Sequence, residues 1–130
     1  MKLTILVLAK PGSPIIKACP PHNRPIIIYQ MNIVDTINNN IKKFLLLKIS
    51  PDINNEIIKE ISKLLIEYKV NALIVSNTTD QNRDNLKDHQ KFQRGGLSGK
   101  PLRNISNKLI NHFFKNLNGQ VKIIGVGGVD

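Results

Sequence analysis

The sequence predicts an α/β fold built on a parallel sheet, and the part of the chain from Phe44 onward carries this prediction. Short apolar runs of strand length alternate there with longer segments whose apolar residues recur at helical spacing. Alternation of this kind is typical of βαβ units, in which a helix connects two parallel strands. A length of 130 residues fits one domain, because domains commonly contain about 100–150 residues.

Three apolar runs are the predicted parallel strands: Phe44–Ile49, Ala72–Ser76 and Val121–Val126. The first is apolar apart from Lys48 and ends at Ser50-Pro51, a pattern that favours a strand buried on both faces. Two amphipathic helices are predicted between the strands, over Asn55–Tyr68 and Ile105–Leu117. Asn54 can cap the first helix, and Gly119 is placed to end the second.

The first 43 residues form a separate, less regular region. Met1–Ala9 has the apolar pattern of a strand, and it is followed by Lys10-Pro11 rather than by the small residues of a signal-peptide cleavage site. Several prolines then interrupt the chain. Residues 26–29 fit a short strand or the start of an irregular helix, and residues 33–41 fit a poor helix. We therefore divide the chain into residues 1–43, with one strand and an irregular or helical segment, and residues 44–130, with the βα units.

The charge balance is strongly basic, with 19 Lys plus Arg against 9 Asp plus Glu and a net charge of +10. The excess comes from 15 Lys against only 4 Arg, beside 20 Ile and 16 Asn, all residues with codons rich in A and T. Nucleic-acid surfaces favour Arg forks and aromatic platforms, yet aromatic residues are 5% here. We expect no specific nucleic-acid partner and at most weak phosphate affinity.

Cysteine and histidine usage excludes other classes of site. The single Cys19 excludes a disulfide framework and a Cys-based zinc cluster. The three histidines match no metal-ligand spacing, so no metal site is predicted. The longest apolar runs are about a third of the ~20 residues that a membrane span needs, and we expect a cytoplasmic chain.

A long connection marks the expected site. Nearly thirty residues, from Asn77 to Asn104, separate the second parallel strand from its helix, and loops of that length inside a compact domain are usually functional. This one leaves the carboxyl end of a parallel strand, the edge at which α/β folds place ligands. The site is therefore expected at Lys48-Ile49, from Ser76 onward, and at Gly125–Gly128.

The residues at that edge suit an anionic ligand. Lys48 either reaches solvent at the rim or meets an anion, because an unpaired buried ammonium is costly. Ser76–Thr79 is dense in hydrogen-bonding groups, although turn formation explains part of it equally well. The glycines of Gly95–Gly99 and Gly125–Gly128 let backbone amides approach an anion closely. Together they favour a phosphate-bearing ligand.

Four segments resemble the carboxy-terminal half of dihydroorotate dehydrogenase, in its quinone-dependent class: Leu47–Asp52, Ile74–Thr79, Gly95–Leu102 and Ile123–Val129. The resemblance covers about Phe44 to Asp130. It implies an FMN-containing enzyme that oxidises dihydroorotate to orotate in pyrimidine synthesis and passes electrons to quinone. The implied fold is a partial TIM-type β/α barrel, with about four parallel strands and flanking helices.

The resemblance also implies roles for individual residues. Lys48 corresponds to the lysine beside the flavin ring, where a cation stabilises charge on the reduced flavin. Ser76, Gly99 and Gly128 correspond to FMN-contacting positions, the last near the phosphate. Asn77 and Thr78 correspond to the residues that hydrogen-bond the orotate ring.

The chain departs from the family at the catalytic base. The family uses a serine in a Ser-Pro-Asn-Thr-like segment about forty residues before the lysine, and this register falls near Thr4–Pro11, which contains neither Ser nor Asn. The eighth strand and the membrane-associating amino-terminal segment of the family are not matched either. We therefore predict no catalytic residue and no activity for the chain alone, whether it is a relic, a frameshifted product or a truncated gene model.

Two other functions stay open from the sequence: a non-catalytic remnant that binds phosphate-containing ligands weakly, and a basic nucleic-acid binder. A partial barrel also leaves apolar strand edges open, so self-association through these edges is expected.

Overall fold

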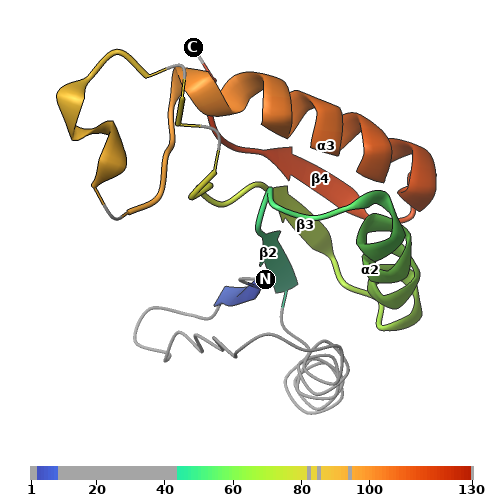
Figure 1. Cartoon of the computed structure of the whole chain (residues 1–130). Coiled ribbons are helices and arrows are strands. Elements are labelled where there is room, and N and C mark those ends of the chain that lie inside the picture. Colours follow the sequence, from blue (N-terminus) through green and yellow to red (C-terminus); the bar gives the residue numbers. More distant parts are fainter. Residues whose placement is uncertain (1–2, 9–43, 82, 85, 94, 130) are drawn as a thin grey trace.

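The computed structural model describes residues 3–8, 44–81, 83–84, 86–93 and 95–129. These residues form a four-stranded sheet in the order β1-β2-β3-β4 (Figure 1). The strands are β1 (Leu3–Leu8), β2 (Phe44–Ile49), β3 (Ala72–Val75) and β4 (Lys122–Gly125). The helices are α2 (Asn55–Glu67) and α3 (Arg103–Leu117), and two short 3-10 helices, η1 (His89–Phe92) and η2 (Lys100–Leu102), precede α3.

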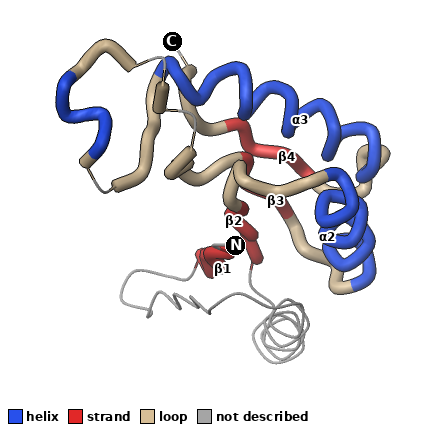
Figure 2. Tube along the Cα trace, in the orientation of Figure 1, coloured by secondary structure: helices blue, strands red, loops and turns tan. Residues whose placement is uncertain are grey.

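The three strands from β2 to β4 are parallel and consecutive. β2 pairs with β3 from Leu46↔Ala72 to Ile49↔Val75, and β3 pairs with β4 from Ala72↔Lys122 onward. The chain passes through α2 between the first two strands and through α3 between the next two, and both helices cover the same face of the sheet (Figures 1 and 2). The predicted α/β fold with parallel strands joined by helices is confirmed for this part of the chain.

The predicted direction of the first strand is wrong. β1 lies beside β2 but runs antiparallel to it, with Leu3 opposite Ile49 and Leu8 opposite Phe44. The described sheet therefore has three parallel strands and one antiparallel strand, not four parallel strands. An apolar run specifies a strand but not its direction, which depends on the connection that follows it: a parallel neighbour needs a crossover, usually a helix. The segment that follows β1 has a poor helical pattern.

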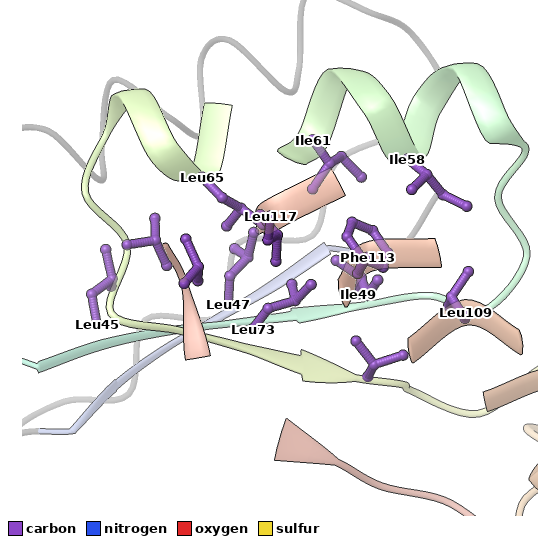
Figure 3. Packing of buried hydrophobic residues seen from close by; sticks show 13 residues of the cluster. Leu45, Leu47, Ile49, Ile58, Ile61, Leu65, Leu73, Leu109, Phe113 and Leu117 are labelled. Carbon is purple, nitrogen blue, oxygen red and sulfur yellow. The ribbon is translucent and has the colours of Figure 1, made fainter. Parts of the chain in front are cut away.

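The core lies between the sheet and the two helices. Leu45, Leu47 and Ile49 of β2 face α2 and α3 because side chains alternate along a strand, and β3 contributes Leu73 and Val75 to the same cluster. Figure 3 shows Ile61 and Leu65 of α2 pointing into this cluster. On the opposite face of the sheet, Leu46, Ala72 and Ile74 form a second buried cluster. The prediction that β2 is buried on both faces is confirmed.

The helix ends follow local sequence signals with one difference. The Oδ1 atom of Asn54 accepts a hydrogen bond from Ile57 N at 2.9 Å, so Asn54 is the cap predicted for α2. At the carboxyl end of α3, Asn118 adopts a left-handed conformation and Gly119 follows with φ 76°. However, α3 begins at Arg103 instead of Ile105, because η2 leads directly into it with Pro101 in its first turn.

The long segment between β3 and α3 contains η1 and η2. Within its described residues, Thr79 and Leu97 form an isolated bridge. Arg83 holds this segment together. Its guanidinium donates to the carbonyl oxygens of Lys91 and Gln93, at 3.2 and 2.6 Å, and also to that of Gly95. The segment therefore has internal order despite its scarcity of regular structure.

Other expectations lie outside the described residues. The alternatives for residues 9–43, including Cys19 and His22, are among them. Within the described part of the chain, neither helix combines the length and the apolar character required for a membrane span.

Candidate functional site

The carboxyl ends of β2, β3 and β4 are joined by backbone hydrogen bonds. Asn77 N, just after β3, donates to Ile49 O of β2 at 2.7 Å. On the other side, Ser76 N donates to Val126 O at 3.1 Å, and Val126 N donates to Val75 O at 2.6 Å. The polar and glycine-rich segments that follow these strands therefore meet at one edge of the sheet, as predicted.

The glycine-rich segment from Gly95 reaches the same edge through Leu97. Leu97 N donates to Thr79 O at 2.6 Å, and Thr79 N donates to Leu97 O at 3.1 Å. Gly96 then lies against Thr78, so close that a Cβ atom at position 96 would overlap the Thr78 side chain. Only glycine permits this approach, which places the Gly95-Gly96 backbone beside Thr78.

Lys48 lies on the face of the sheet away from α2 and α3. Leu47 and Ile49 belong to the core under the helices, whereas Leu46 belongs to the opposite cluster, and alternation places Lys48 with Leu46. The side chain is half-buried. No hydrogen bond or ion pair joins it to any residue that the structure describes.

Ser76 is buried, and its hydroxyl is used within the fold. It donates to Asn77 O at 3.0 Å and lies 3.3 Å from the hydroxyl of Ser106 in α3. Ser106 in turn donates to Val126 O at 3.2 Å. These contacts fix the end of β3 to α3 and to the end of β4. A ligand contact from the Ser76 hydroxyl would have to replace one of them.

Asn77 and Thr78 are the two polar residues that remain accessible at the end of β3. Asn77 is half-buried, and its Oδ1 atom accepts a hydrogen bond from Thr78 N at 2.9 Å. Its Nδ2 group makes no hydrogen bond to the described residues. Thr78 is exposed. An amide donor and a hydroxyl side by side can hydrogen-bond a small polar ring.

Thr78 also borders a cavity of 530 Å³. The described residues that line it are Thr78, Asp80, Arg83, Phe92, Gln93, Gly95 and Gly96. The sequence predicts Thr78 as a site residue but not Arg83 and Phe92, which belong to the long segment and carry no recognisable spacing. Lys48 and Gly128 are not among the described lining residues.

Gly99 and Gly128 occupy different environments. Gly99 has φ 72° and precedes η2, and a Cβ atom built there would meet nothing within 4 Å, so its surroundings are open. Gly128 has φ 73° and packs against the first residue of α3: an added Cβ atom would lie 2.9 Å from Arg103 N. The Nε group of Arg103 donates to Gly128 O at 2.8 Å. Gly128 thus brings the end of β4 to the amino terminus of α3, where backbone dipoles favour anions.

Two further residues connect the ends of β2 and β3. The Oγ1 atom of Thr79 donates to Asp52 Oδ1 at 2.6 Å, and Thr79 is fully buried. Both residues belong to segments that resemble the family, but the sequence predicts no role for either. Their contact joins positions 27 residues apart, which no local spacing reveals.

Comparisons with known proteins identify the family of this chain. The family model for dihydroorotate dehydrogenase matches residues 26–130, so the similarity begins before Phe44, where the sequence analysis placed its start. Among curated proteins, the dihydroorotate dehydrogenase (quinone) of Psychromonas ingrahamii is 47% identical over 85 residues, which are 65% of this chain and 25% of the relative. The Haemophilus ducreyi protein of the same name is 47% identical over 88 residues, 67% of this chain and 26% of the relative.

Solved structures give the same result. The Eimeria tenella DHODH in complex with ferulenol has a TM-score of 0.64 and 40% sequence identity, covering 65% of this chain and 23% of that one. The ligand-free form has a TM-score of 0.66 and 33% identity, with coverage of 82% and 33%. The chain spans about a quarter of the length of the curated relatives that it matches. Because the family model covers most of the sequence, this chain belongs to the dihydroorotate dehydrogenase family.

Proposed function

We propose that the edge formed by the ends of β2, β3 and β4 is the FMN- and dihydroorotate-facing part of a quinone-dependent dihydroorotate dehydrogenase. The observation that carries this proposal is the position of Lys48, a half-buried cation without a partner among the described residues. It precedes Ile49, whose carbonyl oxygen accepts the hydrogen bond from Asn77 N. A cation and the polar side chains of Asn77 and Thr78 thus lie at neighbouring strand ends.

The same proposal includes a section of a β/α barrel. β2, β3 and β4 follow one another in the sheet, and both connecting helices pack on one face. A barrel has its helices on the outer face only, whereas a doubly wound sheet has helices on both faces. The arrangement of β2, β3 and β4 supports the first of these, with Lys48 on the face that would line the barrel.

The residues at this edge fit FMN. Lys48 lacks a partner among the described residues, the surroundings of Gly99 are open, and Gly128 lies at the amino terminus of α3. Lys48, Ser76, Gly99 and Gly128 would hold the cofactor. The chemistry that FMN supplies when bound is acceptance of a hydride, which leaves negative charge on the flavin ring. Lys48 would stabilise that charge as a nearby cation.

Substrate orientation is assigned to Asn77 and Thr78. The Nδ2 group of Asn77 can donate to a carbonyl or carboxylate oxygen of dihydroorotate, and the Thr78 hydroxyl can donate or accept. The serine base of the family removes a proton from dihydroorotate, and a general base contributes about 10²–10⁴-fold to the rate of such a step. The segment Thr4–Pro11 contains no Ser for this role. We therefore propose that the 130-residue chain binds but does not turn over dihydroorotate when tested alone.

Titration of the purified chain with FMN tests this function. We expect a saturable change in the visible flavin spectrum, and Lys48→Ala should weaken FMN binding by about tenfold, the equivalent of ~1.4 kcal/mol. Lys122→Ala is the matched control, because Lys122 pairs in register with Ala72 and so lies on the same face of the sheet, but at the opposite end of the strands. It should leave the affinity within about twofold at constant salt.

The opposite result is equally clear. A wild-type chain that leaves the flavin spectrum unchanged would contradict specific FMN binding at this edge. Equal losses of FMN affinity in the two lysine variants would contradict it as well, and would instead favour a remnant that attracts phosphate groups through its net charge of +10.

A further inference from the structure

Thr79 is unusually well connected for a residue in a long loop segment. Its hydroxyl donates to Asp52 Oδ1 at 2.6 Å and accepts from Gln81 N at 3.0 Å. Its backbone N–H and C=O both pair with Leu97. The residue is fully buried, so every one of these groups would be costly to leave without a partner.

Asp52 is fixed in turn to the end of β2. Its backbone N–H donates to Ser50 Oγ at 3.3 Å, and Ser50 Oγ lies 3.5 Å from Asp52 Oδ2. Ser50 is buried and directly follows the last residue of β2. The contact between Thr79 and Asp52 therefore links the loop after β3 to the strand that carries Lys48.

Asn77 and Thr78 lie between two fixed points. On one side, Ser76 is bonded to Val126 and is in contact with Ser106. On the other side is Thr79, with its bonds to Asp52 and Leu97. Two residues between such anchors have few alternative backbone conformations, which limits where their side chains can be.

We propose that Thr79 and Asp52 act as a pair of positioning residues that set the conformation of the substrate-facing residues Asn77 and Thr78. The inference rests on the proposed function for the identity of the ligand. It assigns different roles to the two adjacent threonines: Thr78 faces the ligand, whereas Thr79 directs its hydroxyl into the protein and orders its neighbour.

Amide hydrogen exchange of the full 130-residue chain tests the pair without any ligand. Thr79→Val and Asp52→Ala should each speed exchange at the Asn77, Thr78 and Leu97 amides by about tenfold, the effect of losing one hydrogen bond to a charged group. Thr79→Ser keeps the hydroxyl and should stay within about twofold of wild type. In the double variant, amide exchange should be no faster than in the more affected single variant, because the two side chains act through one hydrogen bond.

Ser62→Ala is the matched control. The Ser62 hydroxyl is also buried and donates to Ile58 O at 2.8 Å, but it does so inside α2. Its loss should change overall stability without selectively affecting the three amides. Should Thr79→Val fail to fold, Asp52→Ala decides the question, since Asp52 is only half-buried.

A second measurement connects the pair to the ligand. With FMN bound, orotate is added and the flavin spectrum followed: Thr79→Val should weaken orotate binding by about tenfold while FMN affinity stays within about twofold. The proposal is overturned if the three amides exchange no faster in Thr79→Val and Asp52→Ala than in Ser62→Ala. It is also overturned if Thr79→Ser speeds their exchange as much as Thr79→Val does. If wild type binds no FMN, the proposed function fails, whereas the exchange result still decides the positioning role.

Discussion

At the scale of single residues, the site depends on close contacts that only particular side chains permit. Gly96 lies against Thr78 without room for a Cβ atom, and Thr78 borders the cavity of 530 Å³. Thr79, one residue later, is buried and bonded to Asp52. Small changes at these positions should therefore alter the site more than their size suggests.

Gly96→Ala tests the approach to Thr78. The added methyl group would overlap the Thr78 side chain, so we expect a loss of about 1–3 kcal/mol in the free energy of unfolding. Gly125→Ala is the control, because a Cβ atom there meets only the flexible end of Ile110, at 3.1 Å. It should cost less than about 1 kcal/mol. Urea unfolding of both variants provides the measurement, and equal losses would contradict the described packing of Gly96.

The sequence indicates some of these residues and not others, for a physical reason. Lys48 is visible because it interrupts an apolar strand, and Asn77 and Thr78 are visible because they follow one. Asp and Thr are both suited to turns, so the sequence explains Asp52 and Thr79 without any contact between them. Their contact depends on the register of β2 against β3, which a single sequence does not contain.

At the scale of elements, α3 shows how the apolar face of a helix is divided. Phe113 is fully buried in the core, whereas its neighbour Phe114 is 66% exposed. Adjacent residues of a helix point in directions about 100° apart, so two identical side chains have different energetic roles.

This division predicts unequal effects of the same substitution. Phe113→Ala should lower the free energy of unfolding by about 3–5 kcal/mol, because it opens a cavity between α3, α2 and the sheet. Phe114→Ala should change it by less than about 0.5 kcal/mol. Thermal unfolding followed by circular dichroism measures both, and comparable losses would show that α3 is rotated relative to the described packing.

Periodicity and capping predict the elements well where they are local. The apolar stripe and Asn54 predict α2 to within one residue of its observed end at Glu67. The start of α3 is two residues earlier than predicted, because η2 continues into it. The direction of β1 is predicted wrongly, since its apolar pattern is the same for either direction and its pairing with β2 is a long-range property.

At the scale of the whole molecule, the chain matches only part of its relatives. It spans about a quarter of the length of its curated relatives, and the similarity includes the strand ends that form the proposed site. Among the described strands, β4 pairs only with β3, and Ile124 within β4 and Val126 just after it are exposed. Self-association of the isolated chain through this edge stays a prediction.

The most direct test of FMN binding at the ends of β2, β3 and β4 places the residues of this chain in a relative. In the Psychromonas ingrahamii enzyme, the stretch that matches this chain, 85 residues at 47% identity, is replaced by the corresponding residues of this chain, and the oxidation of dihydroorotate by the purified chimera is measured. We predict a yellow, active enzyme whose rate falls by about a hundredfold with Lys48→Ala and is unchanged with Lys122→Ala. A chimera that folds, as judged by circular dichroism, but is colourless and inactive would contradict the account, as would an active one that is indifferent to Lys48→Ala.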